Sequence, residues 1–227
     1  MNTTYYGHSC FELEYAGKSM LFDPFIRPNP LAAHIDVAAI CPDVLLLSHG
    51  HEDHVADAVE IAERSQAQCV SIYELHSWLL QKGIVRSHPM NIGGEWTFDD
   101  WTVRMTPALH SSSLPNGQYG GLAAGFVLSH ASEPTVYFAG DTALFSDMQL
   151  IGQRSKLDLA FLPIGGNFTM NVQEAIQAAQ WLQVRTVIGM HYDTFGYIGI
   201  DQNQAKAWFA NAGVQLELLN IGETRTY

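Results

Sequence analysis

Short apolar runs, separated by polar or turn-forming residues, recur along the whole chain. Their length and composition predict β-strands, and Val44–Ser48 is apolar enough for a strand that is buried on both faces. The strands expected from this pattern are Cys10–Tyr15, Lys18–Phe22, Val44–Ser48, Gln68–Ile72, Thr102–Thr106, Ala123–Ser129, Thr135–Ala139, Leu157–Leu162 and Thr186–Met190.

Several of the segments between these strands predict helices. Thr169 and Asn171 are candidate N-caps, because their short polar side chains can accept a hydrogen bond from the first turn of a helix that follows them. The expected helices are one that begins near Asp53 and runs through Val55–Arg64, and three more at Glu74–Lys82, Val172–Leu182 and Gln202–Ala212.

Strands and helices alternate throughout, and no low-complexity linker, charge block or internal repeat divides the chain. Hydrophobic residues make up 47% and charged residues 15% of the composition, which is enough apolar material for a sizeable core. Two sheets packed face to face with helices outside satisfy this pattern in one layered domain over residues 1–227. The expected fold class is therefore α/β (α+β).

Neither membrane insertion nor secretion is indicated by the sequence. No run approaches the roughly 20 apolar residues of a membrane helix, and the N-terminus lacks the basic start and apolar run of a signal peptide. The cysteines Cys10, Cys41 and Cys69 form no CxxC pair. We interpret them as free thiols, which favours a cytoplasmic protein with no membrane partner.

Strand-like runs end in residues that can bind metal ions. If these strands lie side by side, their ends meet at one edge of the sheets and bring together ligands from distant parts of the chain. The residues are His49, His110, Asp141 and His191, which follow Val44–Ser48, Trp101–Pro107, Thr135–Gly140 and Thr186–Met190.

The densest group of potential ligands is His49-Gly50-His51-Glu52-Asp53-His54. Imidazole nitrogen and carboxylate oxygen are good ligands for zinc and similar ions. In an extended segment alternate side chains point to the same side, so His49 and His51 face one ion. Asp53 and His54 then begin a helix, where they are positioned for a second ion. Glu52 is expected to point away. Such spacing arises by chance in about one of a thousand such sequences, which disfavours a polar loop with incidental histidines.

This run resembles the His-x-His-x-Asp-His signature of the metallo-β-lactamase superfamily. The resemblance extends nearly from end to end of the chain. Within the superfamily, the chain is similar to the branch of small metal-dependent hydrolases related to the ascorbate-phosphate lactonases. Its other motifs are Gly7-His8-Ser9, Asp23-Pro24-Phe25, Gly140-Asp141-Thr142, Pro163–Met170 and Met190-His191-Tyr192.

The resemblance implies a four-layer αββα sandwich and a centre for two divalent metal ions. Zinc is the expected metal, with manganese, nickel and iron as alternatives. By this resemblance one ion is held by three histidines, the other by a carboxylate and two histidines, and a further carboxylate bridges them. The implied sets are His49, His51 and His110 for the first, Asp53, His54 and His191 for the second, and Asp141 as the bridge.

Two departures from other branches of the superfamily favour hydrolysis of an ester, lactone or phosphodiester. Its antibiotic-hydrolysing members usually have a cysteine where this chain has Asp141, and its redox members tend to replace the histidine at position 51 with glutamate. Two ions share a water and make it a nucleophile at neutral pH, so no Ser9 or Cys10 nucleophile is needed. Asp53 and Asp141 are therefore assigned to catalysis as well as to metal binding.

Other residues near the motifs each have functional and structural interpretations. His8 is a further ligand, a proton donor, a hydrogen-bond partner of a ligand, or a buried structural histidine. Asp23 is an acceptor that orients a ligand imidazole or a turn-forming residue before Pro24. Asn167, Phe168 and Thr169 line the substrate site or form a plain turn and cap. The loop Phe25–Ala33 covers the site and supplies a cation through Arg27, or Arg27 is a solvated loop charge.

Charge separates the leading hypothesis from one of its alternatives, an endonuclease. The formal charge is −12, and two dications would change it to −12 + 4 = −8, so a polyanion is repelled. The expected partner is therefore a small molecule and not nucleic acid. A small anion remains a candidate, because bound metals dominate the local electrostatic field. An RNA or DNA endonuclease and a metal-bearing sensor without turnover are the alternatives, and a homo-oligomer is left open.

Overall fold

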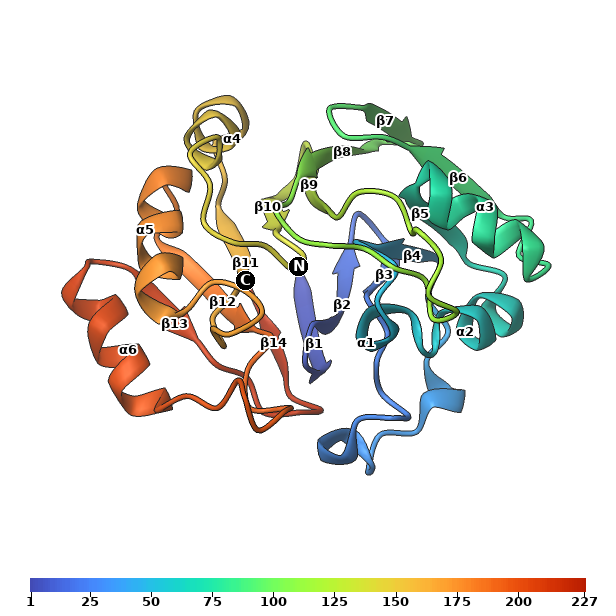
Figure 1. Cartoon of the computed structure of the whole chain (residues 1–227). Helices are drawn as coiled ribbons and strands as arrows, with labels where there is room; N and C mark the ends of the chain where they lie inside the picture. Colours follow the sequence, from blue (N-terminus) through green and yellow to red (C-terminus); the bar gives the residue numbers. More distant parts are fainter.

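Two seven-stranded β-sheets pack face to face in the computed structural model, which describes residues 1–227 (Figure 1). The first sheet has the order β14-β1-β2-β3-β4-β5-β6 and the second β13-β12-β11-β10-β9-β8-β7. The strands of the first sheet are β1 (Asn2–Gly7), β2 (Cys10–Tyr15), β3 (Lys18–Phe22), β4 (Val44–Leu47), β5 (Gln68–Ile72), β6 (Ser87–Met90) and β14 (Thr224–Thr226). Those of the second are β7 (Glu95–Phe98), β8 (Trp101–Pro107), β9 (Ala124–His130), β10 (Glu133–Phe138), β11 (Leu159–Pro163), β12 (Thr186–Met190) and β13 (Gln215–Glu217).

Helices cover the outer faces and complete a four-layer αββα sandwich (Figure 1). Helix α3 packs on β5 and β6, whereas α5 packs on β11 and α6 on β13 of the other sheet. The helices are α1 (Glu52–Val55), α2 (Ala58–Ser65), α3 (Tyr73–Gln81), α4 (Met148–Ser155), α5 (Val172–Leu182) and α6 (Gln202–Asn211), with 3-10 turns η1 (Pro30–Ala32) and η2 (Val37–Ala39).

Each sheet is antiparallel in one half and parallel in the other. Strands β1 to β3 and β7 to β10 pair antiparallel, while β3 to β6 and β10 to β13 pair parallel. The central parallel strands β4 and β11 are buried at every residue, as expected for strands covered on both faces. The residues that follow their carboxyl ends lie at one edge of the sandwich, where polar side chains are no longer surrounded by the core.

Aromatic side chains join the two sheets across the core. Phe22 of β3 stacks on Phe138 of β10 with ring centroids 4.5 Å apart, and Phe11 of β2 meets the edge of Phe161 of β11 at 4.8 Å. These contacts belong to a cluster of 67 buried hydrophobic residues. Because close-packed interiors resist deformation, this core fixes the positions of the strand ends.

The αββα sandwich and the central strands are confirmed, but one expected helix is wrong. Instead of a single helix through Val55–Arg64, the structure has α1 and α2 with a break at Asp57. The buried Asp57 carboxylate accepts hydrogen bonds from the backbone N–H groups of Ile26 and Arg27, and its own N–H donates to Pro24. This tie to the loop after β3 interrupts the helix. Sequence analysis also missed α4 and the strands β1, β6, β7, β13 and β14.

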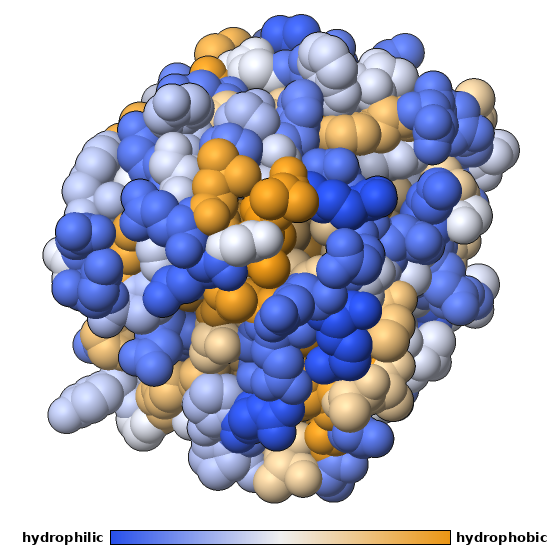
Figure 2. Space-filling model, turned by 90° about the vertical axis from the view of Figure 1, so that its right-hand side faces the viewer, coloured by the Kyte–Doolittle hydropathy of each residue, from blue (hydrophilic) through white to orange (hydrophobic).

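No helix has the length and apolarity needed to cross a bilayer. Figure 2 shows one face of the molecule, on which polar side chains predominate and apolar ones gather near the middle. Exposed apolar area of this kind is normal on folded proteins.

Gly152→Ala tests the close packing of α4 against α5. A Cβ at Gly152 would lie 2.5–2.7 Å from backbone atoms of Leu182 at the end of α5. Alanine normally stabilises a helix by about 1 kcal/mol relative to glycine. Here we expect the clash to dominate and to lower the free energy of unfolding by about 1–3 kcal/mol. Thermal unfolding measures the change.

Gly199→Ala is the matched control, because a Cβ at Gly199 meets nothing within 4 Å. Its melting temperature should stay close to that of the wild type. A Gly152→Ala protein as stable as this control would contradict the close approach of the two helices.

Candidate metal centre

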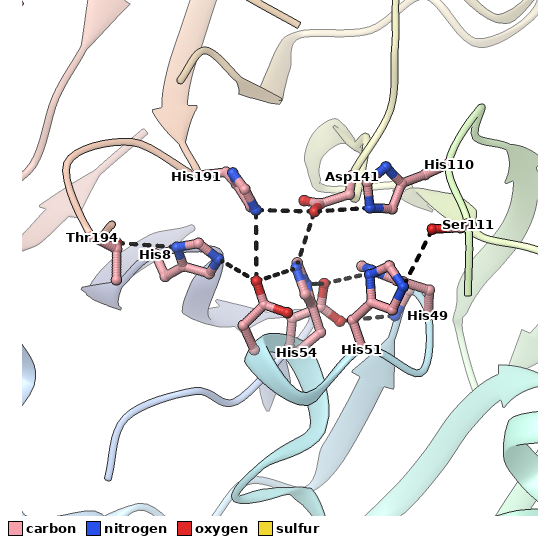
Figure 3. Close-up of polar contacts among 12 residues, drawn as sticks. His8, His49, His51, His54, His110, Ser111, Asp141, His191 and Thr194 are labelled. Atoms are coloured by element: carbon pink, nitrogen blue, oxygen red, sulfur yellow. Dashed lines mark hydrogen bonds and ion pairs between the residues drawn. The ribbon is translucent and has the colours of Figure 1, made fainter. Parts of the chain in front are cut away.

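Strand ends bring the ligand candidates together at one edge of the sandwich (Figure 3). His49 follows β4, and His51 is the N-cap residue of α1, with φ −62° and ψ 147°. Asp53 and His54 lie in the first turn of α1, where the helix dipole favours a carboxylate. The other three follow strands of the second sheet, namely His110 after β8, Asp141 after β10 and His191 after β12.

Three histidines form the first group of potential ligands. One ring nitrogen from each of His49, His51 and His110 lies within 4.8 Å of the others. His49 Nε2 is 2.9 Å from His51 Nδ1, and the His110 ring centroid lies 5.2 Å from that of His49. Two imidazole nitrogens that face each other so closely are arranged like neighbouring ligands of one ion.

The second group combines a carboxylate with histidines. His8, Asp53, His54 and His191 each offer an atom within 4.8 Å of the others. Asp53 Oδ2 lies 3.1 Å from His8 Nε2, 3.8 Å from His191 Nε2 and 3.9 Å from His54 Nε2. The group thus contains the three residues expected for the second ion, and it adds His8.

Asp141 contacts both groups. Its Oδ2 lies 3.0 Å from His191 Nε2, 3.3 Å from His54 Nε2 and 3.5 Å from His110 Nε2. His110 belongs to the first group and the other two histidines to the second. The carboxylate therefore lies between the two groups of potential ligands and contacts both.

Unpaired polar atoms show that the donor set fits a metal ion. His54 Nε2 and Asp141 Oδ1 are buried without a hydrogen-bond partner. Buried polar atoms are nearly always paired, and an orphan is explained by an ion or water. Imidazole nitrogens and carboxylate oxygens are the ligands that zinc and related divalent ions use. The residues present therefore fit such an ion.

Buried Asp23 orients a histidine of each group. It accepts hydrogen bonds from the Ser48 hydroxyl at 2.5 Å and from His54 Nδ1 at 2.8 Å. Because the Ser48 hydroxyl donates to Asp23, its oxygen accepts from His49 Nδ1 at 3.0 Å. Both His49 and His54 then carry a proton on Nδ1, so Nε2 is the atom that each ring would offer to an ion. Asp23 is also within 4.8 Å of these rings, but Oδ2 accepts these two bonds and Oδ1 accepts the Ser48 N–H.

His8 connects the second group to a surface loop. Its Nδ1 lies 3.0 Å from Thr194 Oγ1, while its Nε2 faces Asp53. The His8 carbonyl accepts a hydrogen bond from the His191 N–H at 2.9 Å. Burial and the neighbouring His191 lower the pKa of His8 to about 4. His8 is thus a neutral side chain that braces Asp53, His191 and the loop after β12.

Electrostatics differ between the two groups. Burial lowers the pKa of all three histidines in the first group. Burial also opposes charge on His54 and His191, but Asp141 outweighs it and raises the pKa of His54 well above normal and that of His191 to about 9. The same contacts hold the pKa of Asp141 well below its usual value, against the effect of burial. The carboxylate is therefore ionised, the form that binds cations.

Strained backbone accompanies these positions. His8, Asp23 and His191 have φ of 58°, 41° and 55°, in the left-handed region that non-glycine residues rarely adopt. Such conformations persist only where surrounding contacts determine them, and they cluster at functional sites. Here they turn the side chains of these residues toward the centre.

A cavity of about 930 Å³ adjoins the ligand candidates. Its walls include Glu52, which sequence analysis expected to point away. Phe168 lies on the wall, whereas its neighbours Asn167 and Thr169 are not among the lining residues. Arg27 is also absent from the lining, since its guanidinium pairs with Glu60 at 2.7 Å.

Several residues of this cavity were not predicted from the sequence. Ser111 lies one position after a ligand candidate, and Thr194 to Tyr197 follow closely after another, His191. An aromatic and glycine-containing segment directly after a strand that ends in a ligand was the available signal. Phe25 also lines the cavity, and it is the first residue of the loop that was expected to cover the site.

Comparison with known proteins finds similarity over the whole chain. The sequence profile described as "Beta-lactamase superfamily domain" matches residues 19–192. A protein from Methylacidiphilum infernorum named "UPF0173 metal-dependent hydrolase" is 47% identical over 224 residues, which cover 99% of each chain. A relative of the same name from Anoxybacillus flavithermus is 45% identical over 228 residues, again 99% of each chain.

Solved structures agree. Igni18, described as a novel metallo hydrolase from the archaeon Ignicoccus hospitalis KIN4/I, superposes with a TM-score of 0.90 at 36% identity, covering 100% of this chain and 97% of that one. An isothiocyanate hydrolase from Delia radicum gut bacteria has a TM-score of 0.82 at 22% identity, covering 100% and 99%. The second likeness concerns the fold alone.

Asp23→Asn tests the role of the buried carboxylate in orienting both histidine groups. Asp23 accepts from the Ser48 hydroxyl and His54 Nδ1 at Oδ2 and from the Ser48 N–H at Oδ1. An amide has only one oxygen and cannot accept at both places, so the anchoring of both rings is weakened. We expect the affinity for divalent ions to fall about 10–100-fold at both groups. Competition with a chromogenic chelator measures the affinity. Ser48→Ala removes the hydroxyl that connects Asp23 to His49 and leaves the bond between Asp23 and His54, so it should weaken mainly the ion of the first group.

Asp147→Asn is the control, because Asp147 is exposed and contacts only Ser146 through its side chain. It should bind ions like the wild type. Equal affinities for Asp23→Asn and this control would show that Asp23 has no part in metal binding.

Proposed function

The chain belongs to the beta-lactamase superfamily and within it to the UPF0173 metal-dependent hydrolases, and on that premise we propose that it is a dinuclear hydrolase of small esters, lactones or phosphodiesters. Family membership establishes that the chain is a metal-dependent hydrolase. The proposal adds the number of metal ions and the class of bond that is cleaved. One observation carries it: Asp141 Oδ2 lies within 3.5 Å of histidines from both ligand groups.

Two ligand groups support two divalent ions, with zinc as the first candidate. His49, His51 and His110 would hold one ion, and Asp53, His54 and His191 the other, with Asp141 shared. The first set has three neutral imidazoles and the second adds a carboxylate, so both match the ligand preferences of zinc. Manganese, nickel and iron use the same ligand types.

Divalent ions at such a centre supply Lewis-acid polarisation of a carbonyl or phosphoryl oxygen and a hydroxide nucleophile at neutral pH. The residues of the chain provide the setting for this chemistry. Asp141 and Asp53 concentrate negative charge between the histidines, and Asp23 holds two rings in the tautomers that bind. The strained His191 backbone, bonded to His8, keeps that imidazole directed inward.

Asp141 also supports oxygen-rich substrates over β-lactams. A carboxylate is a harder ligand than the thiolate that the antibiotic-hydrolysing members usually have there. A harder site suits the oxygens of esters and phosphates. Penicillins and carbapenems are therefore expected to be poor substrates.

An endonuclease is the alternative that the charge distribution disfavours. A nuclease neutralises several phosphates with Lys or Arg along a track. The formal charge of the chain is −12, and no lysine or arginine lines the cavity. A small substrate needs no such track. A sensor without turnover is disfavoured by relatives named as hydrolases.

We also propose a cytoplasmic location. The three cysteines are free, and Cys10 and Cys69 are buried within the sheets. Free thiols in the core are typical of proteins from a reducing compartment.

Removal of metal should abolish activity and lower stability. Ions that bind the native state alone contribute about 4 kcal/mol at a thousandfold excess over Kd. For a chain of this size that corresponds to a melting temperature on the order of 10 °C lower after chelation. Turnover of a panel that contains a lactone, a phosphodiester and a thioester measures the first effect, and thermal unfolding measures the second. Both are compared between chelated protein and protein reloaded with zinc or manganese.

The panel also contains a penicillin and a structured RNA. His49→Ala is the control that separates activity of this centre from contamination, since it should remove every turnover seen with the wild type. The proposal fails if no small substrate is turned over by reloaded protein, or if the RNA is cleaved faster than all of them.

A further inference from the structure

We propose that the substrate carries an uncharged aromatic or branched apolar group, bound on an aromatic wall of the cavity beside the metal centre. This inference rests on the proposed function, which states the class of bond that is cleaved. The aromatic wall would bind the part of the substrate that does not react. The aromatic wall is defined as Phe25, Phe168, Phe195 and Tyr197.

Separate loops build the aromatic wall. Phe25 lies in the loop after β3, Phe168 in the loop after β11, and Phe195 and Tyr197 in the loop after β12. The rings form two pairs, Phe25 with Phe195 at 6.1 Å between centroids and Phe168 with Tyr197 at 6.3 Å. Such pairs are offset or edge-to-face arrangements that leave apolar ring surface toward the cavity.

Exposure increases along the wall from one pair to the other. Phe25 is 6% exposed, whereas Phe168 is 50% and Tyr197 is 79% exposed. His8, which bonds to Asp53, contacts Phe25 and Phe195 with ring centroids 5.5 and 5.2 Å away, so this inner pair adjoins the centre. The outer pair contributes little to the core, and a ligand in the cavity would cover it.

Charge on the cavity wall argues against an anionic group at this position. Apart from the ligand candidates, whose charge the bound ions would offset, the one charged residue that lines it is the acidic Glu52, and no lysine or arginine does. The nearby cation, Arg27, is paired with Glu60 and Asp57 and its side chain is 59% exposed. A carboxylate or phosphate on the wall would lose hydration without gaining a partner, which is unfavourable.

Size is consistent with such a substrate. A cavity of about 930 Å³ is within the range of roughly 300–1,000 Å³ that small-molecule sites occupy. Neutral polar groups of the substrate can reach the Ser111 hydroxyl, which lies on the cavity wall 3.4 Å from His51 Nε2. The reacting bond and the apolar group therefore have separate places.

Matched probes test the inference in metal-loaded protein. The substrates are 4-nitrophenyl phenylacetate, the same ester with a para-carboxylate on the phenylacetyl ring, and 4-nitrophenyl acetate. We expect the kcat/KM of the first to exceed that of each of the others about tenfold or more. Binding of 2-phenylacetamide and of its para-carboxy derivative, measured by calorimetry, should show the same preference independently of turnover.

Variants of the outer pair assign the preference to the wall. Phe168→Ser and Tyr197→Ser should each weaken 2-phenylacetamide binding about tenfold. Phe168→Arg should turn the preference toward the carboxylate. Tyr73→Ser is the matched control, because Tyr73 is an aromatic residue with 59% exposure that does not line the cavity.

The two proposals fail by different results. Stronger binding of the carboxylate by the wild type, or unchanged binding in both serine variants, would overturn the aromatic wall as the substrate site. Absence of all ester, lactone and phosphodiester turnover, with the binding preference intact, would instead overturn the proposed reaction and support the wall.

Discussion

The buried Asp141 carboxylate is the group around which the centre is arranged. A carboxylate removed from water is stable only where opposite charge or donors compensate it. Asp141 Oδ2 has three imidazoles within 3.5 Å, from His54, His110 and His191. These belong to three different segments of the chain, so the compensation exists only when both sheets are in place. The site therefore depends on the whole fold. The aromatic contacts between the sheets fix the positions of the strand ends, and the strand ends fix the positions of the ligand candidates.

Around this carboxylate, specific contacts hold conformations that the chain would not adopt alone. Asp23 and His191 have left-handed backbone, which costs on the order of 1–3 kcal/mol at each position. Hydrogen bonds from Ser48 and His54 to Asp23, and from the His191 N–H to His8, offset this strain. The loop after β12 then carries both a brace for the centre and half of the aromatic wall, which links substrate binding to ligand geometry.

Sequence alone predicted the parts of the structure that depend on local pattern. Strands β2 and β3 were predicted with their observed bounds, and β4 was predicted because a strand covered on both faces is apolar throughout. Short edge strands such as β14 were missed because their pairing, not their composition, makes them strands. Most ligand candidates lie in motifs and His110 follows a predicted strand, so all of them could be proposed from the sequence. The aromatic wall comes from three loops whose meeting depends on the tertiary fold, so the sequence suggested single members such as Phe168 but not the wall as a whole.

The central claim is a pair of ions joined by Asp141. Metal content per chain, measured by inductively coupled plasma mass spectrometry after equilibrium dialysis, tests it most directly when anomalous diffraction locates the ions. The account predicts two divalent ions per chain, one among His49, His51 and His110 and the other among Asp53, His54 and His191, with Asp141 touching both. A single ion per chain at saturating metal, or a second ion away from Asp141, would contradict it.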